Sequence, residues 1–170
     1  MGVRSGFANQ TEWYDMRFFE DMVIGEVRVS RSHRVTLAAM LEFARKYDPQ
    51  YFHADPALAE QSIFGEVIAS GIYGAALWRL LDHEISGDIR WICGVAWENV
   101  RWPQPLRAGD EVRARSEILA KRLSRSDAAR GVIECGYSLL NQRDEQVFIC
   151  RSINLIEVKN HPGLATPEKI

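Results

Sequence analysis

Two side chains that can transfer protons, Asp48 and His53, lie in one short segment of the chain, YDPQYFH (residues 47–53). The segment directly follows a stretch whose apolar residues recur at helical spacing. A carboxylate and an imidazole just past a helix end can converge on a small volume, where they can hold a water molecule and move its protons. Such a pair is more often a cap and a bystander, so its interpretation depends on the rest of the chain.

A second segment with chemical potential is IASGIYG (residues 68–74), which has the pattern of a helix start. A helix N-terminus offers backbone N–H groups and a dipole that favours negative charge. Gly71 has no side chain, so its N–H could approach a developing oxyanion closely. The alternative is that Gly71 and Gly74 only allow the helix to pack closely against a sheet.

Composition and charge limit the classes of function. The chain has 170 residues, of which 46% are hydrophobic, and this suits one domain with a single core. The net charge of -2 and the pI near 6.1 argue against a general nucleic-acid or anionic-membrane binder. Without a signal pattern or a membrane-spanning apolar run, a soluble cytoplasmic protein is expected. Cys93, Cys135 and Cys150 have no CxxC spacing and lie in apolar, strand-like surroundings, so neither disulfides nor a zinc site are expected.

The helices that must position the proton-transfer residues can be predicted from caps and prolines. Thr36 can cap a helix that Pro49 stops. The residue before a proline is pushed out of helical conformations, so Asp48 should lie at the helix exit with its side chain free to point away from the helix. Asp55, followed by a proline, can cap a short helix through about Gln61 and is interpreted as structural.

A longer helix, from about Ser70 to His83, is apolar on most of its surface and is predicted to be buried. The rest of the chain alternates in the manner of a long antiparallel meander. Helices early and strands late indicate an α+β fold in which one sheet covers one buried helix. Residues 1–14 are predicted to be a flexible arm, 15–158 the domain and 159–170 a flexible tail. The predicted strands are residues 27–35, 95–102, 111–121, 131–140 and 147–158.

The order of these segments resembles the MaoC-like dehydratases, which are hot-dog-fold relatives of R-specific enoyl-CoA hydratases. The resemblance extends over roughly residues 15 to 158, and its most specific part is the turn from Asp48 to His53. The segments that carry it are YDPQYFH, the Ala-Ser-Gly helix opening, VRWP (residues 100–103) and LRAGD (residues 106–110).

In that family the turn usually reads Asp-x-Asn-Pro-x-His, so Asp48 and His53 match the catalytic pair. Gln50 and Tyr51 stand where Asn and Pro are usual, which leaves the orientation of the pair open. Gly71 matches the glycine whose N–H forms the oxyanion hole. At the position where some members place a serine near the active site, this chain has Arg79, to which no role is transferred.

The resemblance implies a hydro-lyase with a single hot-dog domain, an antiparallel sheet wrapped around a long apolar central helix. The implied reaction is the reversible addition of water to a 2-enoyl-CoA, giving an (R)-3-hydroxyacyl-CoA. Asp48 and His53 would share the water while Gly71 stabilises the oxyanion, and either of the pair could be the base. Gln50, Ser70 and Gly71 are predicted to bind the substrate. No metal and no tightly bound cofactor are expected, since coenzyme A, or alternatively acyl carrier protein, arrives with the substrate.

Two other functions stay open: a hot-dog acyl-CoA thioesterase and a non-catalytic acyl-thioester-binding subunit. Release of free thiol would identify the first, and the presence of both Asp48 and His53 argues against the second. Weaker candidates for catalysis are His33, His83 and His161, and a role for Arg101, Arg107 and Arg113 toward coenzyme A phosphates stays unassigned.

A homodimer or higher homo-oligomer is predicted, and the resemblance implies that the acyl site lies along the subunit boundary. A single sheet on one helix leaves an exposed edge strand and an uncovered apolar surface. Residues of the partner subunit near the strand at residues 95–102 are expected to complete the site around Asp48 and His53. The tryptophans are interpreted as core and dimer surface rather than as a platform for an adenine; these are Trp78, Trp91, Trp97 and Trp102.

Overall fold

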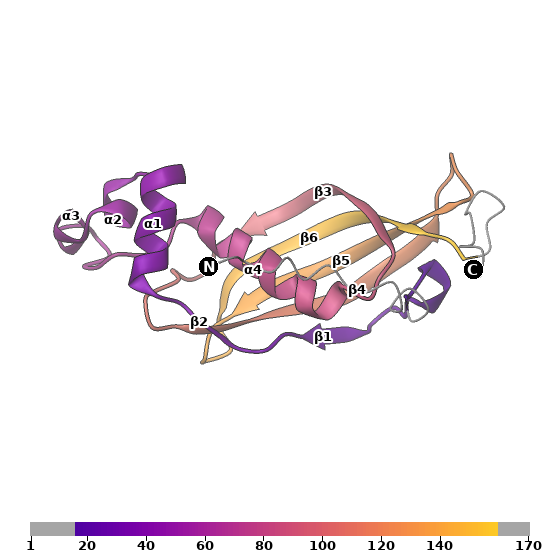
Figure 1. Cartoon of the computed structure of the whole chain (residues 1–170), viewed down its shortest axis with the longest axis horizontal. Helices are drawn as coiled ribbons and strands as arrows, with labels where there is room; N and C mark the ends of the chain where they lie inside the picture. The colour runs from indigo at the N-terminus through magenta and orange to yellow at the C-terminus, as the bar shows by residue number, and fades with distance from the viewer. Residues whose placement is uncertain (1–15, 160–170) are drawn as a thin grey trace, which may run out of the picture.

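A six-stranded antiparallel sheet with one long helix, α4 (Gly71–Ser86), lying across its face organises the chain (Figure 1). The computed structural model describes residues 16–159, so the predicted arm and nearly all of the predicted tail lie outside the described residues. The architecture is the predicted α+β hot-dog fold. The strands are β1 (Val27–Val29), β2 (His33–Arg34), β3 (Trp91–Arg101), β4 (Glu111–Leu123), β5 (Arg130–Leu140) and β6 (Gln146–Glu157).

The strand order is β1-β4-β5-β6-β3, with β2 also pairing with β4. β4, β5 and β6 form the predicted meander, but the prediction is wrong for β3, which pairs with β6 instead of β4. The segment at residues 102–110 therefore carries the chain from β3, at one edge of the sheet, past β6 and β5 to β4. Alternation identifies a strand but not its partner, which is why this crossing was not predicted. It leaves β3 as an edge strand.

The single strand predicted over residues 27–35 is interrupted. β1 and β2 both pair with β4, and Ser30 lies between them. The Ser30 hydroxyl accepts a hydrogen bond from the backbone N–H of Ala114 at 2.9 Å. A side chain thus replaces a ladder carbonyl at this point, which breaks the strand without leaving a buried N–H unpaired.

Three short helices form a cluster at one end of the sheet (Figure 1). α1 (Leu37–Tyr47) begins at the predicted cap, where the Thr36 hydroxyl accepts from the N–H of Ala39. α3 (Pro56–Glu60) begins at the predicted Asp55 cap. Between them lies α2 (Tyr51–Ala54), a single helical turn where only an irregular turn was expected. α2 is too short for its sequence to show a helical period.

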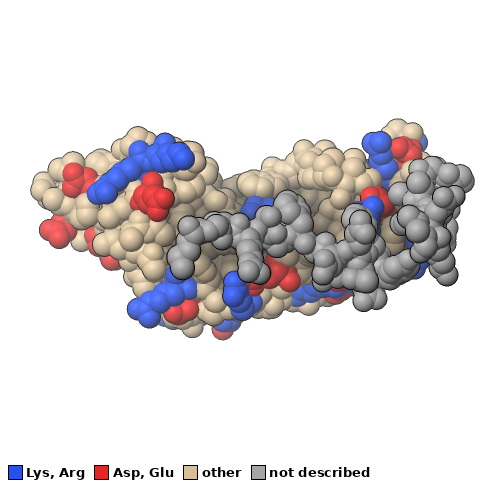
Figure 2. Space-filling view, viewed as in Figure 1, with Lys and Arg blue, Asp and Glu red and all other residues tan. Residues whose placement is uncertain are grey.

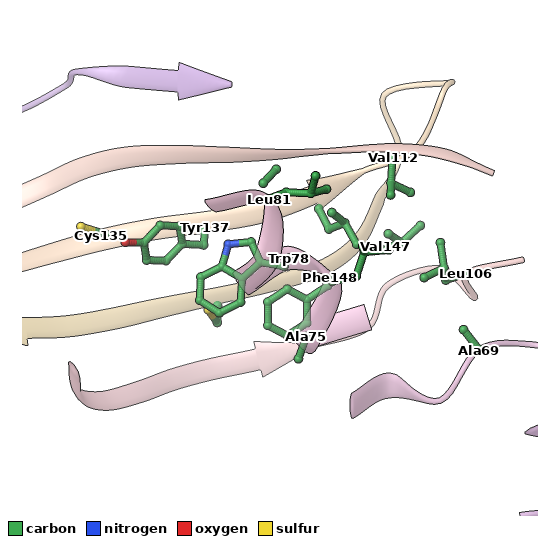
Figure 3. Packing of buried hydrophobic residues seen from close by; sticks show 14 of the residues in the cluster. Ala69, Ala75, Trp78, Leu81, Leu106, Val112, Cys135, Tyr137, Val147 and Phe148 are labelled. Carbon is green, nitrogen blue, oxygen red and sulfur yellow. The ribbon is translucent and has the colours of Figure 1, made fainter. Parts of the chain in front are cut away.

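The central helix α4 extends beyond the predicted end at His83 to Ser86. Its inner face packs in an aromatic cluster, with the Trp78 ring 4.7 Å from Tyr137 and 5.3 Å from Phe148 between centroids (Figure 3). Each such ring contact adds about 0.5–1.5 kcal/mol beyond burial. This packing fixes the helix, and therefore its N-terminus, against the sheet.

The prediction that α4 is buried nearly all round is wrong for the single chain. Ile72 and Leu80 are 57% and 59% exposed, respectively, whereas Asp82 is buried. Only one face of α4 packs on the sheet, so the apolar residues of its other face require a further surface if they are to leave water.

The surface and the remaining sequence features fit a single-core protein. Cys135 and Cys150 are buried, as expected, but Cys93 is exposed on the edge strand; all three are free. On the face shown in Figure 2, basic and acidic side chains are interspersed and form no continuous basic surface. Within residues 16–159, no helix has the length and apolar character needed to cross a membrane.

Candidate active site

A cavity of about 450 Å³ lies where the helical cluster meets the N-terminus of α4. Asp48, His53 and Gly71, which come from three different elements, all line it. The cavity thus brings together the three predicted catalytic residues and both other predicted substrate-binding residues. The remaining lining residues are Gln50, Phe52, Phe64, Ile68, Ala69, Ser70, Ile72, Gly74, Trp102, Gln104, Pro105, Leu106 and Val147.

Asp48 is the C-cap of α1, as predicted, and two side chains hold its carboxylate. The Ser70 hydroxyl donates to Oδ2 at 2.6 Å, and the Gln50 amide donates to Oδ1 at 3.0 Å. These hydrogen bonds keep the pKa of Asp48 below its ordinary value of 3.8, and the bond from Ser70 has the larger effect. Asp48 is therefore an ionised acceptor at neutral pH, with a fixed orientation.

His53 is buried, and its tautomer follows from its partner. Nδ1 lies 2.7 Å from the carbonyl oxygen of Ile68. A carbonyl oxygen can only accept, so Nδ1 carries a hydrogen and the neutral ring presents the lone pair of Nε2. That Nε2 lies 3.8 Å from Asp48 Oδ2. Two atoms at this separation are too far apart for a direct hydrogen bond, but both can contact one water oxygen.

The start of α4 completes the site. Gly71 is the first residue of the helix, so its backbone N–H has no partner within α4. Ser70 precedes it as the N-cap, and its hydroxyl accepts from the N–H of Ile72 at 3.2 Å. The same hydroxyl donates to Asp48, so Ser70 connects the helix start to the carboxylate. Ser70 lines the cavity, but its hydroxyl is engaged with protein atoms on both sides.

Gln50 likewise lines the cavity while its amide contacts Asp48. The sequence predicted Ser70 and Gln50 as substrate contacts and missed their hydrogen bonds to the carboxylate. The chain separates Ser70 from Asp48 by 22 positions, so no local pattern could reveal the bond. Sequence reasoning also missed Trp102, whose indole N–H donates to the carbonyl of Gly71. Its only signal was its place in the VRWP segment.

The weaker candidates that fall within residues 16–159 lie away from the cavity lining. His83 contacts Arg79 at 3.1 Å on α4, and Arg79 pairs with the buried Asp82 at 2.5 Å. Arg107 pairs with Glu66. Arg113 pairs with Asp144, His33 lies in β2, Arg101 ends β3, and His161 is outside the described residues. Among residues 16–159, no group of three or more His, Cys, Asp or Glu side chains could hold a metal ion.

The chain is similar to known proteins over most of its length. Residues 19–134 match the model of the MaoC-like domain. The uncharacterized protein YdeM of Bacillus subtilis (strain 168) is 30% identical over 133 residues, which cover 76% of this chain and 91% of YdeM. A MaoC-like dehydratase from Rhodospirillum rubrum has 33% identity and a TM-score of 0.77, covering 85% of this chain and 99% of that one.

A more distant structure is similar in fold alone. The (R)-hydratase from A. caviae involved in PHA biosynthesis is 20% identical, with a TM-score of 0.63 over 79% of this chain and 97% of that one. The family match, by contrast, includes the Asp48 turn, the start of α4 and most of the sheet. The chain therefore belongs to the MaoC-like dehydratase domain family.

Proposed function

We propose that the protein is an enoyl-thioester hydratase or dehydratase, which adds water reversibly to a 2-enoyl thioester and forms an (R)-3-hydroxyacyl thioester. The observation that carries this proposal is the convergence of the Asp48 carboxylate, the His53 imidazole and the start of α4 at Gly71 on one cavity. Membership of the MaoC-like family supports the reaction class. The name of the A. caviae (R)-hydratase, which has the same fold, motivates the stereochemistry.

The parts of the site match the demands of the reaction. A water molecule between Asp48 Oδ2 and His53 Nε2 gives its oxygen to C3, and the pair takes up the proton that it releases. The C2–C3 π bond breaks, and its electrons develop charge on the thioester oxygen. The N–H of Gly71 and the positive end of α4 stabilise this charge. One proton returns from the pair to C2, so water is added and the pair is regenerated.

The cavity wall suits an acyl chain. Apart from the polar groups around Asp48, its lining includes Phe52, Phe64, Leu106 and Val147. An apolar pocket with a few converging polar groups is the usual form of a small-ligand site. We assign the acyl group to this wall and the thioester to the Gly71 end, with coenzyme A or acyl carrier protein outside.

The acting species in this proposal is a homo-oligomer that pairs through the edge strand β3. Ile92, Val95 and Trp97 on β3 are all at least 41% exposed, and the backbone edge beyond β3 has no neighbouring strand within the described sheet. Edge strands with exposed apolar side chains associate readily, and a two-fold axis closes such a contact. The exposed Ile72 and Leu80 on α4 would gain cover in the same assembly.

The direct test measures the absorbance of the enone thioester with a panel of 2-enoyl-CoA substrates of increasing chain length. Loss of absorbance with formation of the (R)-3-hydroxyacyl-CoA, identified by chiral chromatography, is the expected result. A thiol reagent added to the same reactions reports thioester cleavage. Thiol release without hydration would identify the thioesterase alternative. Neither reaction with any member of the panel, in folded protein, would contradict an enzymatic role on acyl-CoA.

A further inference from the structure

Trp102 lies directly over the first residue of α4. It follows the end of β3, and its Nε1–H donates to the carbonyl oxygen of Gly71 at 2.9 Å. A Cβ atom built on Gly71 would lie 2.8 Å from Cε2 and 2.9 Å from Nε1 of the indole. Real Cβ atoms essentially never make contacts this short, so any larger residue at position 71 would force the indole of Trp102 out of its present position. Gly71 and Trp102 therefore form a matched pair.

The same indole is part of the cavity wall. Trp102 lines the cavity together with Asp48, His53 and Gly71, and the residue is 47% exposed. Its ring centroid lies 6.2 Å from that of Phe148, so it borders the core cluster as well. A large aromatic side chain that is half exposed at the rim of a cavity is available for contact with a ligand.

The contact addresses a physical conflict at the oxyanion site. Glycine allows a substrate oxygen to approach its N–H, but glycine also has the greatest backbone freedom of any residue. A hydrogen-bond donor stabilises a transition state effectively only if it is already oriented. Ser70 restrains the chain on the N-terminal side of Gly71, and the indole restrains its Cα and carbonyl on the other side.

We propose that Trp102 is a positioning residue for the oxyanion donor: it clamps Gly71 so that the N–H is held toward the cavity, and its ring forms the wall along which the enoyl thioester lies. The inference rests on the proposed hydration reaction. It gives Trp102 two separable contributions, one from the indole N–H and one from the ring surface.

The first experiment separates these contributions by steady-state kinetics with the best 2-enoyl-CoA substrate. Trp102→Phe keeps an aromatic wall but removes the N–H donor, and is expected to lower kcat roughly 10-fold with KM within about threefold. Trp102→Ala removes both contributions and is expected to raise KM as well. Trp91→Phe is the matched control, because Trp91 begins β3 and does not line the cavity. A normal kcat in Trp102→Phe would overturn the proposal that the indole N–H of Trp102 positions Gly71.

The second experiment tests the pairing itself. Gly71→Ala places a methyl group against the indole and is expected to reduce kcat roughly 10²-fold. In Gly71→Ala/Trp102→Ala the clash is gone, so the double variant should be within about threefold of Trp102→Ala alone. Multiplied losses in the double variant would show that the two residues act independently and would overturn the proposal.

A readout without turnover accompanies both experiments. The midpoint of thermal unfolding should fall in Gly71→Ala and recover when Trp102→Ala is added, and unchanged midpoints would count against the pairing.

Butyryl-CoA, which has no double bond to hydrate, should quench tryptophan fluorescence in the wild type and in Trp91→Phe but not in Trp102→Phe. Equal quenching in all three proteins would refute the proposal that the Trp102 ring contacts the acyl thioester. If the wild type hydrates no enoyl-CoA, the proposed function fails; if it does and Trp102→Phe is normal, only the clamp fails.

Discussion

Ser70 donates a 2.6 Å hydrogen bond to the carboxylate of Asp48 while the same hydroxyl caps the helix that begins at Gly71. One side chain thus fixes the position of the proposed proton-transfer group relative to the proposed oxyanion donor. The distance between these two groups determines whether a water and a thioester oxygen can be engaged together. Ser70 therefore holds Asp48 and the start of α4 in position relative to each other without contacting the reacting atoms itself.

Removing this hydroxyl should change the pH dependence of the reaction. Ser70 is the largest cause of the lowered pKa of Asp48, so Ser70→Ala should raise that pKa toward the ordinary value of 3.8. The acid limb of the pH–rate profile, which Asp48 governs, should therefore move to higher pH. Loss of the helix cap should also cost about 1 kcal/mol of folding free energy. Rate profiles and urea unfolding measure the two effects. Ser70→Thr keeps a hydroxyl and serves as control; an unmoved acid limb in Ser70→Ala would contradict the assignment.

The proton-transfer pair should be indispensable. Asp48→Asn and His53→Ala are each expected to reduce kcat by roughly 10²-fold or more, because each removes a group that manages the protons of water. Circular dichroism should show an unchanged fold. Asp144→Asn and His83→Ala make the same chemical changes outside the cavity lining and should leave rates within about twofold. Near-normal turnover in a folded Asp48 or His53 variant would refute the mechanism.

The N–H of Gly71 can be tested by comparing proline with alanine. Both residues carry a Cβ that would meet Trp102, so the comparison belongs in the Trp102→Ala background. Proline suits the first position of a helix, and there it differs from alanine chiefly by lacking the N–H. Gly71→Pro should cost about 3 kcal/mol of transition-state stabilisation more than Gly71→Ala, roughly 10²-fold in kcat/KM. Equal rates in the two folded proteins would assign the oxyanion donor elsewhere.

Assembly through β3 should respond to a charge on the edge. Val95→Lys places a cation on the exposed edge strand and is expected to shift the wild-type oligomer toward the 19.4 kDa chain, with loss of activity. Analytical ultracentrifugation at micromolar concentration measures the shift. Leu123→Lys changes a similarly exposed residue at the end of β4 and should leave the assembly intact. An active wild-type protein sedimenting at the mass of one chain would exclude this arrangement.

An ion-pair network around Glu26, the residue before β1, should make the free energy of unfolding depend on acid pH. Arg17, and then Arg28, lower the pKa of Glu26 from 4.5 to about 2, so this carboxylate is more easily ionised in the folded state. The stabilisation of the folded state by ionised Glu26 is complete above pH 4.5. It is lost as the pH falls from 4.5 toward about 2. Glu26→Gln should cost about 1 kcal/mol at pH 7, allowing for solvent screening.

Urea unfolding of wild type and Glu26→Gln at several pH values checks this dependence. The difference between the two proteins should shrink as the pH is lowered below 4.5. Glu20→Gln is the control, because it makes the same chemical change at an exposed carboxylate that has no ion pair with Arg17 or Arg28 among the described residues. A difference that stays constant down to pH 2 would show that Glu26 acts through packing rather than through its charge.

The sequence by itself determined the features that depend on neighbouring residues. The Thr36 and Asp55 caps, the stop at Pro49 that places Asp48 at a helix exit, and the alternation of β4 to β6 are all local. Each follows from the backbone preferences and side-chain hydrogen bonds of residues a few positions apart. The motif around Asp48 and the glycine at the start of α4 were therefore identifiable, and so was the class of fold.

Only the tertiary structure decided which distant groups meet. The pairing of β3 with β6, the Ile68 carbonyl that sets the tautomer of His53, and the Trp102 ring that packs against Gly71 all join positions that share no local pattern. The exposure of Leu80 was also undetermined, because an apolar helix face does not specify what covers it. Such contacts arise from packing across the whole chain, where shape and unpaired polar groups, rather than sequence spacing, select the partners.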